Sequence, residues 1–85
     1  MENNRVAVIA ILVKEAESTS VLNALLHQYS SFIIGRMGIP YRQRGVNIIS
    51  VAVDAPGDVI STLSGKLGRL PGVTAKTVYA PEGSV

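Results

Sequence analysis

The chain has 85 residues, of which 47% are hydrophobic and 16% are charged, with a net charge of +2 and no cysteine. This length supplies one hydrophobic core, so we expect a single domain over residues 1–85, with its core in about residues 5–79 and no separate DNA-binding or catalytic module. The composition is typical of a folded chain, and the lack of Cys excludes disulfides, thiolate nucleophiles, Cys-ligated zinc and iron–sulfur clusters.

The first half of the chain has the pattern strand, helix, strand. Residues 6–13 form an apolar run rich in β-branched side chains, which predicts a buried strand because a membrane-spanning helix needs about 20 apolar residues. Residues 32–41 form a second extended run. Between them residues 18–29 have helical spacing, with apolar positions at Val21, Leu22, Leu25 and Tyr29. This half therefore predicts one βαβ unit.

The second half repeats the pattern. Residues 46–53 (VNIISVAV) match the first strand (VAVIAILV), and a second helix begins near Pro56, where a missing N–H is harmless. Asp58 stands in its first turn, where a carboxylate favours the helix dipole, and Gly68 ends it. Its apolar positions are Val59, Ile60, Leu63 and Leu67. The last strand is predicted over residues 73–79.

Two βαβ units in tandem predict the α+β class and a ferredoxin-like βαββαβ sandwich, a four-stranded antiparallel sheet with both helices on one face. We expect the strand order 4-1-3-2, with residues 6–13 and 46–53 as the central strands. Pro40 agrees with this order, because it lies in the second strand and proline is confined to the edges of sheets.

Both faces of the predicted sheet are apolar. In the first strand Val8, Ala10 and Leu12 point one way, and the residues between them point the other way. Two helices can cover only one face, which leaves an apolar patch larger than most soluble monomers expose. We therefore expect a homo-oligomer, a dimer or a tetramer, that packs sheet on sheet or joins edge to edge. The predicted interface residues are Ile9, Ile11, Ile49 and Val51.

Three strings of the sequence are distinctive: GRMGIPYRQRG, VNIISVAVDAPGDVISTLSGKLGRLPGV and the closing KTVYA. Through them the chain resembles, from about residue 5 to residue 79, the short, stand-alone family of iron-only hydrogenase system regulators. That family is similar in fold to ACT domains and to the C-terminal ligand-binding domain of the nickel-responsive repressor, which are oligomerising sensors. The resemblance implies a cytoplasmic regulatory protein, associated with hydrogenase maturation and without enzymatic activity or cofactor.

The resemblance does not extend to metal sensing. The nickel-responsive repressor binds its metal through several His and a Cys, whereas this chain has His27 as its only His and no Cys. A lone His near the end of a helix is more often structural than a ligand. Asp54 and Asp58 could supply oxygen ligands across a helix start, but Asp58 is better explained as a first-turn carboxylate. We predict no metal site.

The middle of the chain is locally basic. Residues 18–53 contain no Asp or Glu and hold three arginines, Arg36, Arg42 and Arg44. Guanidinium groups without neighbouring acids suit a carboxylate or a phosphate. The alternative is a solvated hairpin whose charges protect a sheet edge against aggregation. Arg36 is the strongest functional candidate, because strand alternation places it on the face of Phe32 and Ile34.

The predicted ligand site combines this region with the turn before the last strand, which resembles the effector-binding turn of ACT domains. Its residues are Arg36, Gly38, Tyr41, Arg42, Pro71 and Gly72. Each has an alternative explanation. Gly35 and Gly38 match the GXXG loop of nucleic-acid-binding KH domains, but in an extended run they rather indicate a bulge or a close backbone approach. Tyr41 could belong to the interface, and Gly72 could be a turn residue at positive φ.

Nothing in the sequence indicates catalysis. It has no nucleophile and base with a third group to orient the base, no paired carboxylates on one element, and no phosphate-binding glycine loop that opens a helix. The sequence therefore predicts an ACT-like regulatory module that senses a small anionic effector. One alternative is an adaptor that binds a hydrogenase-maturation protein without any small ligand. The other is a nucleic-acid-binding regulator, although direct nucleic-acid binding is not expected, nor is any association with membranes.

Overall fold

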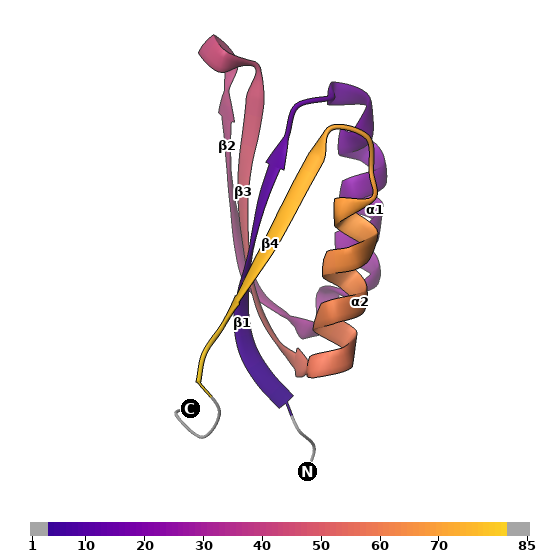
Figure 1. Ribbon diagram of the computed structural model, residues 1–85, viewed down its shortest axis with the longest axis vertical. Coiled ribbons are helices and arrows are strands. Elements are labelled where there is room, and N and C mark those ends of the chain that lie inside the picture. The colour runs from indigo at the N-terminus through magenta and orange to yellow at the C-terminus, as the bar shows by residue number, and fades with distance from the viewer. Residues whose placement is uncertain (1–3, 82–85) are drawn as a thin grey trace.

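Four antiparallel strands form one sheet, and two α-helices lie against one of its faces (Figure 1). This computed structural model describes residues 4–81. The elements in chain order are β1 (Asn4–Val13), the 3-10 turn η1 (Ala16–Ser18), α1 (Thr19–Gln28), the 3-10 turn η2 (Ser30–Phe32), β2 (Ile33–Tyr41), the 3-10 turn η3 (Arg42–Arg44), β3 (Val46–Pro56), α2 (Gly57–Gly68) and β4 (Val73–Tyr79). No helix in these residues is long and apolar enough to cross a membrane.

The strand order is β2-β3-β1-β4, which confirms the predicted ferredoxin-like sandwich. β1 pairs with β3 from Asn4 opposite Pro56 to Val13 opposite Asn47, and its other side pairs with β4. The edge strand β2 carries Pro40, so the missing N–H disrupts no central ladder. The fold therefore places the two longest strands in the middle, where both of their sides are hydrogen-bonded.

The core lies between the helices and the sheet. Leu22 and Leu26 of α1 are buried there, together with Ile60, Leu63 and Leu67 of α2. Each such side chain stabilises the fold by about 1.5–3 kcal/mol through the hydrophobic effect. The helical spacing predicted in α2 is confirmed. In α1 the spacing is shifted, because Val21 is 49% exposed and Leu26 takes the core position instead.

The residues predicted for an interface between copies are instead part of this core. Ile9, Ile11 and Val51 are 0% exposed, and Ile49 is 7% exposed. The alternation along the strands is as predicted, but the helices cover this set of side chains, so a second copy cannot reach it. The face away from the helices is formed by the other set, which includes Val8, Leu12 and Ile48.

A bulge in β2 changes the predicted position of Arg36. The register between β2 and β3 shifts between Ile33 and Gly35, as expected for a strand rich in glycine. Ile33 lies opposite Val53 and Arg36 lies opposite Val51, so both point to the helix side. Arg36 therefore shares a face with Ile33 and not, as strict alternation predicted, with Ile34, which is 63% exposed.

Two loops are tied together at the end of the sheet where β1 finishes. The backbone N–H of Lys14 donates to the carbonyl of Gly72 at 2.8 Å. The buried hydroxyl of Ser18 donates to the carbonyl of Pro71 at 2.6 Å. Gly72 has φ 69°, and a Cβ placed on it would meet Glu15. The turn explanation for Gly72 is therefore confirmed, because only glycine fits this conformation without strain.

Candidate functional site

The β2–β3 hairpin reaches beyond the helices at one end of the molecule (Figure 1). Its tip is the η3 turn, which closes through a hydrogen bond from the Gly45 N–H to the carbonyl of Arg42 at 3.2 Å. Gly45 is in the left-handed conformation with φ 63°, which lets the chain reverse into β3. Nothing from the helix layer covers the tip, so its side chains face solvent or a ligand.

A cleft of about 390 Å³, which we call the hairpin cleft, lies between this hairpin and the end of β1. Lys14 comes from the connection after β1, and Tyr41 and Arg42 come from the hairpin. The cleft is also lined by Val13, Pro40 and Asn47. Pro40 and Asn47 lie opposite each other in the β2–β3 ladder. The cleft thus has one apolar wall and two cationic side chains from opposite sides.

The hairpin cleft is electropositive. Lys14 and Arg42 both line it, and no acidic side chain does. Within residues 4–81 neither of these cations, nor Arg44 beside them, makes an ion pair. Lys14 and Arg42 are 28 positions apart in the sequence, but the fold brings both to this cleft. Their positive charges together attract anions to it.

Arg36 lies in a different place. Its Nη2 donates to Asn23 Oδ1 of α1 at 3.0 Å. It borders a shallow hollow of about 280 Å³ that His27, Ser30 and Ile33 also line. One guanidinium group that already has an amide partner is a weaker attraction for an anion than two free cations. The contact rather joins the edge strand β2 to α1.

Within one chain the structure therefore divides the predicted ligand residues among three places. Tyr41 and Arg42 line the hairpin cleft, and Arg36 borders the hollow beside α1. Gly38 lies opposite Ile49 on the helix side of β2. Pro71 and Gly72 form the turn that contacts Ser18, Lys14 and Glu15. No pattern in the sequence indicated Lys14 as a site residue, because only the tertiary fold brings it to the cleft that Arg42 lines.

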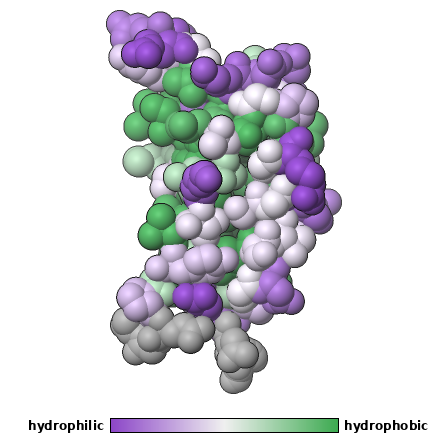
Figure 2. Space-filling model, viewed as in Figure 1, coloured by the Kyte–Doolittle hydropathy of each residue, from purple (hydrophilic) through white to green (hydrophobic). Residues whose placement is uncertain are grey.

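The sheet face away from the helices is the second candidate surface, and we call it the open face. Across it Ile39, Ile48 and Leu12 lie side by side on β2, β3 and β1 and form an apolar ridge. They are 49%, 39% and 44% exposed. Figure 2 shows hydrophobic residues along the side of the sheet that faces away from the helices, next to the hydrophilic hairpin tip.

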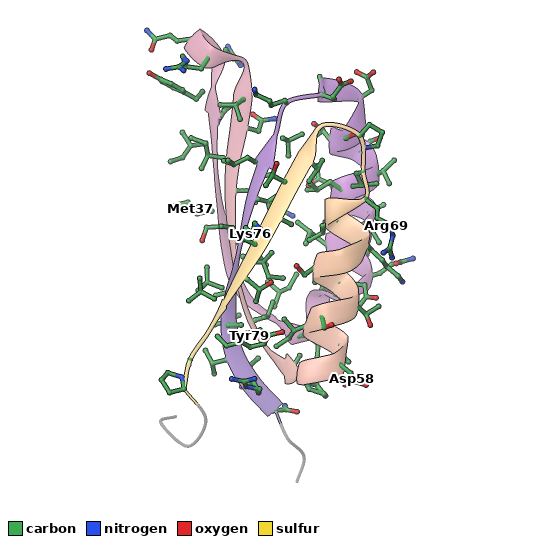
Figure 3. All side chains as sticks on the ribbon, in the orientation of Figure 1. Met37, Asp58, Arg69, Lys76 and Tyr79 are labelled. Atoms are coloured by element: carbon green, nitrogen blue, oxygen red, sulfur yellow. The ribbon has the colours of Figure 1, made fainter. Side chains whose placement is uncertain are left out.

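Beside the apolar ridge the open face is hollowed. The next row across the sheet is Met37, Ser50, Ala10 and Lys76, and the row after it is Gly35, Ala52, Val8 and Val78. The small residues Gly35, Ser50 and Ala52, with Met37 at the rim, line a depression of about 250 Å³. Met37 is 61% exposed and points away from the helices (Figure 3).

The described residues contain no cluster of side chains that could hold a metal ion. No group of three or more His, Cys, Asp or Glu comes together among residues 4–81. Asp54 lies opposite Val6 on the open face, and Asp58 stands in the first turn of α2, as predicted. Ser64 of α2 accepts a hydrogen bond from Thr77 at 3.1 Å, a contact that joins α2 to β4.

Comparison with known proteins identifies the family. The sequence profile of the TM1266-like family, described as "Iron-only hydrogenase system regulator, putative", matches residues 5–77. The chain belongs to that family. The structure of TM1266 from Thermotoga maritima, described as an uncharacterized protein, superposes with a TM-score of 0.88 at 35% identity, over 92% of this chain and 99% of that one. The resemblance inferred from the sequence strings is therefore confirmed, and the family description names a regulator.

More distant structures share the fold alone. The C-terminal domain of the MgtC protein from Mycobacterium tuberculosis has a TM-score of 0.72 at 14% identity, over 96% of this chain and 94% of that one. A formyltetrahydrofolate deformylase from Pseudomonas putida KT2440 has a TM-score of 0.63 at 16% identity, over 89% of this chain and 29% of that one. No curated protein matches the sequence.

Proposed function

We propose that the protein is a non-catalytic regulator of the iron-only hydrogenase system that works as a homo-oligomer, with the open face as the contact between copies and a small anionic effector acting on the assembly. The observation that carries this proposal is the open face itself. It presents Val8, Leu12, Met37, Ile39, Ile48 and Val78, each more than one-third exposed. These exposed apolar side chains on one face support an interaction surface, because soluble monomers rarely expose large contiguous apolar patches.

The shape of the open face and the charges on it favour a second copy of the chain as the binding partner. The apolar ridge stands directly beside the depression lined by Gly35, Ser50 and Ala52. In a two-fold contact each copy presents the same patch, so a ridge next to a hollow can be self-complementary. The strands place only Asp54 and Lys76 as charged side chains on this face within residues 4–81, one of each sign. Opposite charges on one face can pair across a two-fold axis.

The edges of the sheet favour packing of sheet on sheet over joining at β2. That edge has Pro40, which cannot donate a ladder hydrogen bond, and a bulge between Ile33 and Gly35. Both features obstruct the pairing of an edge strand with another chain. Contact through the open face is therefore better supported than joining at the β2 edge.

Regulation would follow from linkage between effector and assembly. An effector that binds one assembly state more tightly than another shifts the population by its difference in affinity. The hairpin cleft borders the open face through Tyr41, which lines the cleft and which strand alternation places on the same side of β2 as Ile39. Occupation of the cleft can therefore affect the contact between copies directly.

The proposal predicts a change in hydrogenase function when the open face is altered in the cell. In the organism that encodes the chain, we expect deletion of the gene to change iron-only hydrogenase activity per cell, and Ile48→Glu at the native locus to reproduce that change. Val21→Glu is the matched control, since Val21 is 49% exposed on α1, away from the open face. Hydrogenase activity and protein level should be measured in all strains. Unchanged hydrogenase activity in the deletion strain would contradict the proposed function.

A further inference from the structure

We propose that the hairpin cleft binds a small molecule with a phosphate or carboxylate group, held by Lys14 and Arg42 and packed against Tyr41. This inference deepens the effector part of the proposed function by naming the site and the ligand chemistry. It rests on the size of the cleft, its charges and the anchoring of the two cations.

The size of the cleft matches a small-molecule site. Its volume is about 390 Å³, and small-molecule sites usually measure about 300–1,000 Å³. The hollow beside Arg36, at about 280 Å³, and the depression on the open face, at about 250 Å³, fall below that range. A ligand of metabolite size therefore fits the hairpin cleft better than either of these.

The lining of the cleft indicates an anion with an apolar body. Arg42 offers a planar fork of donors that matches two oxygens of one phosphate or carboxylate, and Lys14 adds a compact positive charge with three donors. Tyr41, which is 42% exposed, offers a ring against which a flat or apolar group can pack. Pro40 gives apolar surface, and Asn47 gives a further polar contact.

Both cations stand on anchored backbone, so a ligand has to order their side chains but not the backbone that carries them. The N–H of Lys14 is held by the carbonyl of Gly72 at 2.8 Å. Arg42 begins the η3 turn, and the carbonyl of Arg42 accepts a hydrogen bond from the Gly45 N–H at 3.2 Å. A preformed site loses less conformational entropy on binding than a flexible one. Arg44 shares the η3 turn but does not line the cleft.

The inference predicts that pyrophosphate or citrate binds in the cleft of the full-length protein. We expect titration of the ¹⁵N-labelled chain, at a constant ionic strength of about 0.1 M, to shift the amide signals of Lys14, Arg42 and Asn47 and to leave those of Asn23 and Arg36 in place. Lys14→Gln and Arg42→Gln should each weaken binding of the preferred probe at least about tenfold, because a charged hydrogen bond is lost. Arg44→Gln, which removes the same charge next to the cleft, should weaken it less than about twofold.

The two probes separate the possible sources of the anion. Tighter binding of pyrophosphate indicates a phosphorylated effector, and tighter binding of citrate indicates a carboxylate. Equal weakening by Arg42→Gln and Arg44→Gln would overturn the inference, because it would mean diffuse attraction to the basic hairpin. Absence of shifts with both probes, or shifts centred on Asn23 and Arg36, would overturn it as well. The mass of each sample without a probe tests the assembly separately, so failure of the cleft and failure of the proposed oligomer can be told apart.

Discussion

Ile48→Glu is expected to convert the assembled protein to a monomer, while Val21→Glu leaves its mass unchanged. Both positions carry β-branched side chains of similar exposure, 39% for Ile48 and 49% for Val21. They differ in their surroundings, because Ile48 lies in the apolar ridge between Ile39 and Leu12, and Val21 lies on the exposed side of α1. In a packed two-fold interface the new carboxylate would lose its water at a cost of about 3 kcal/mol or more per copy, and the two copies together weaken association at least about 10,000-fold.

Light scattering coupled to size-exclusion chromatography, at several protein concentrations, measures this difference. Circular dichroism of both variants controls for folding, since each substitution replaces a partly exposed side chain and should leave the core intact. Equal masses for the two variants would contradict the account, whether both stay assembled or both dissociate. The first outcome would place the contact elsewhere, and the second would mean that any added charge disrupts the assembly.

Gly72→Ala is expected to be the most destabilising Gly→Ala substitution among residues 4–81. Gly72 has φ 69°, and a left-handed conformation costs a non-glycine residue about 1–2 kcal/mol. The new Cβ would also meet Glu15, with its Cβ at 2.8 Å and its backbone nitrogen at 3.0 Å. The backbone of Glu15 cannot rotate away as a side chain can, so overpacking adds about 1–3 kcal/mol. Together these costs lower the free energy of unfolding by about 2–5 kcal/mol.

Gly45→Ala is the matched control for this prediction. Gly45 has φ 63°, but no atom lies within 4 Å of the position that a Cβ would take. Its substitution should therefore cost only the conformational term, about 1–2 kcal/mol. Thermal unfolding at one fixed protein concentration should show the difference. We expect Gly72→Ala to lower Tm by about 10 °C or more, and Gly45→Ala to lower it by less. Equal decreases for the two variants would mean that the contact with Glu15 does not restrict this turn.

The overall fold could be predicted from the sequence because each element has a strong local signal. The repeated βαβ pattern gave the order of the elements, and Pro40 indicated which strand lies at an edge. The last strand was predicted over the residues that form β4, Val73–Tyr79. These signals depend on side-chain period and backbone chemistry, which act within a few residues.

The sequence could not show which face of the sheet the helices cover. Alternation separates Ile9 and Ile11 from Val8 and Leu12, but both sets are apolar, so hydrophobicity alone does not say which set meets the helices. The deciding residue is Lys76 of β4, which lies opposite Ala10 and so belongs with Val8 and Leu12. Its charge excludes that set from a core, but this argument needs the register between β1 and β4, which the sequence does not provide.

The candidate site was predictable only in part for a related reason. Tyr41 and Arg42 are adjacent in a basic hairpin, so their proximity is local. Lys14 reaches them only through the tertiary fold, because the end of β1 lies beside β3. The position of Arg36 depended on a bulge, and one inserted residue reverses every later side chain of a strand.

The proposed regulation depends on the open face as a contact between copies of the chain. Native mass spectrometry of the unmodified protein, purified from its own organism and held at micromolar concentration, tests it most directly. We expect two or four times the chain mass of 9.0 kDa, with any retained effector visible as added mass. A single species of 9.0 kDa across that concentration range would contradict it, and would favour an adaptor whose open face awaits a different protein.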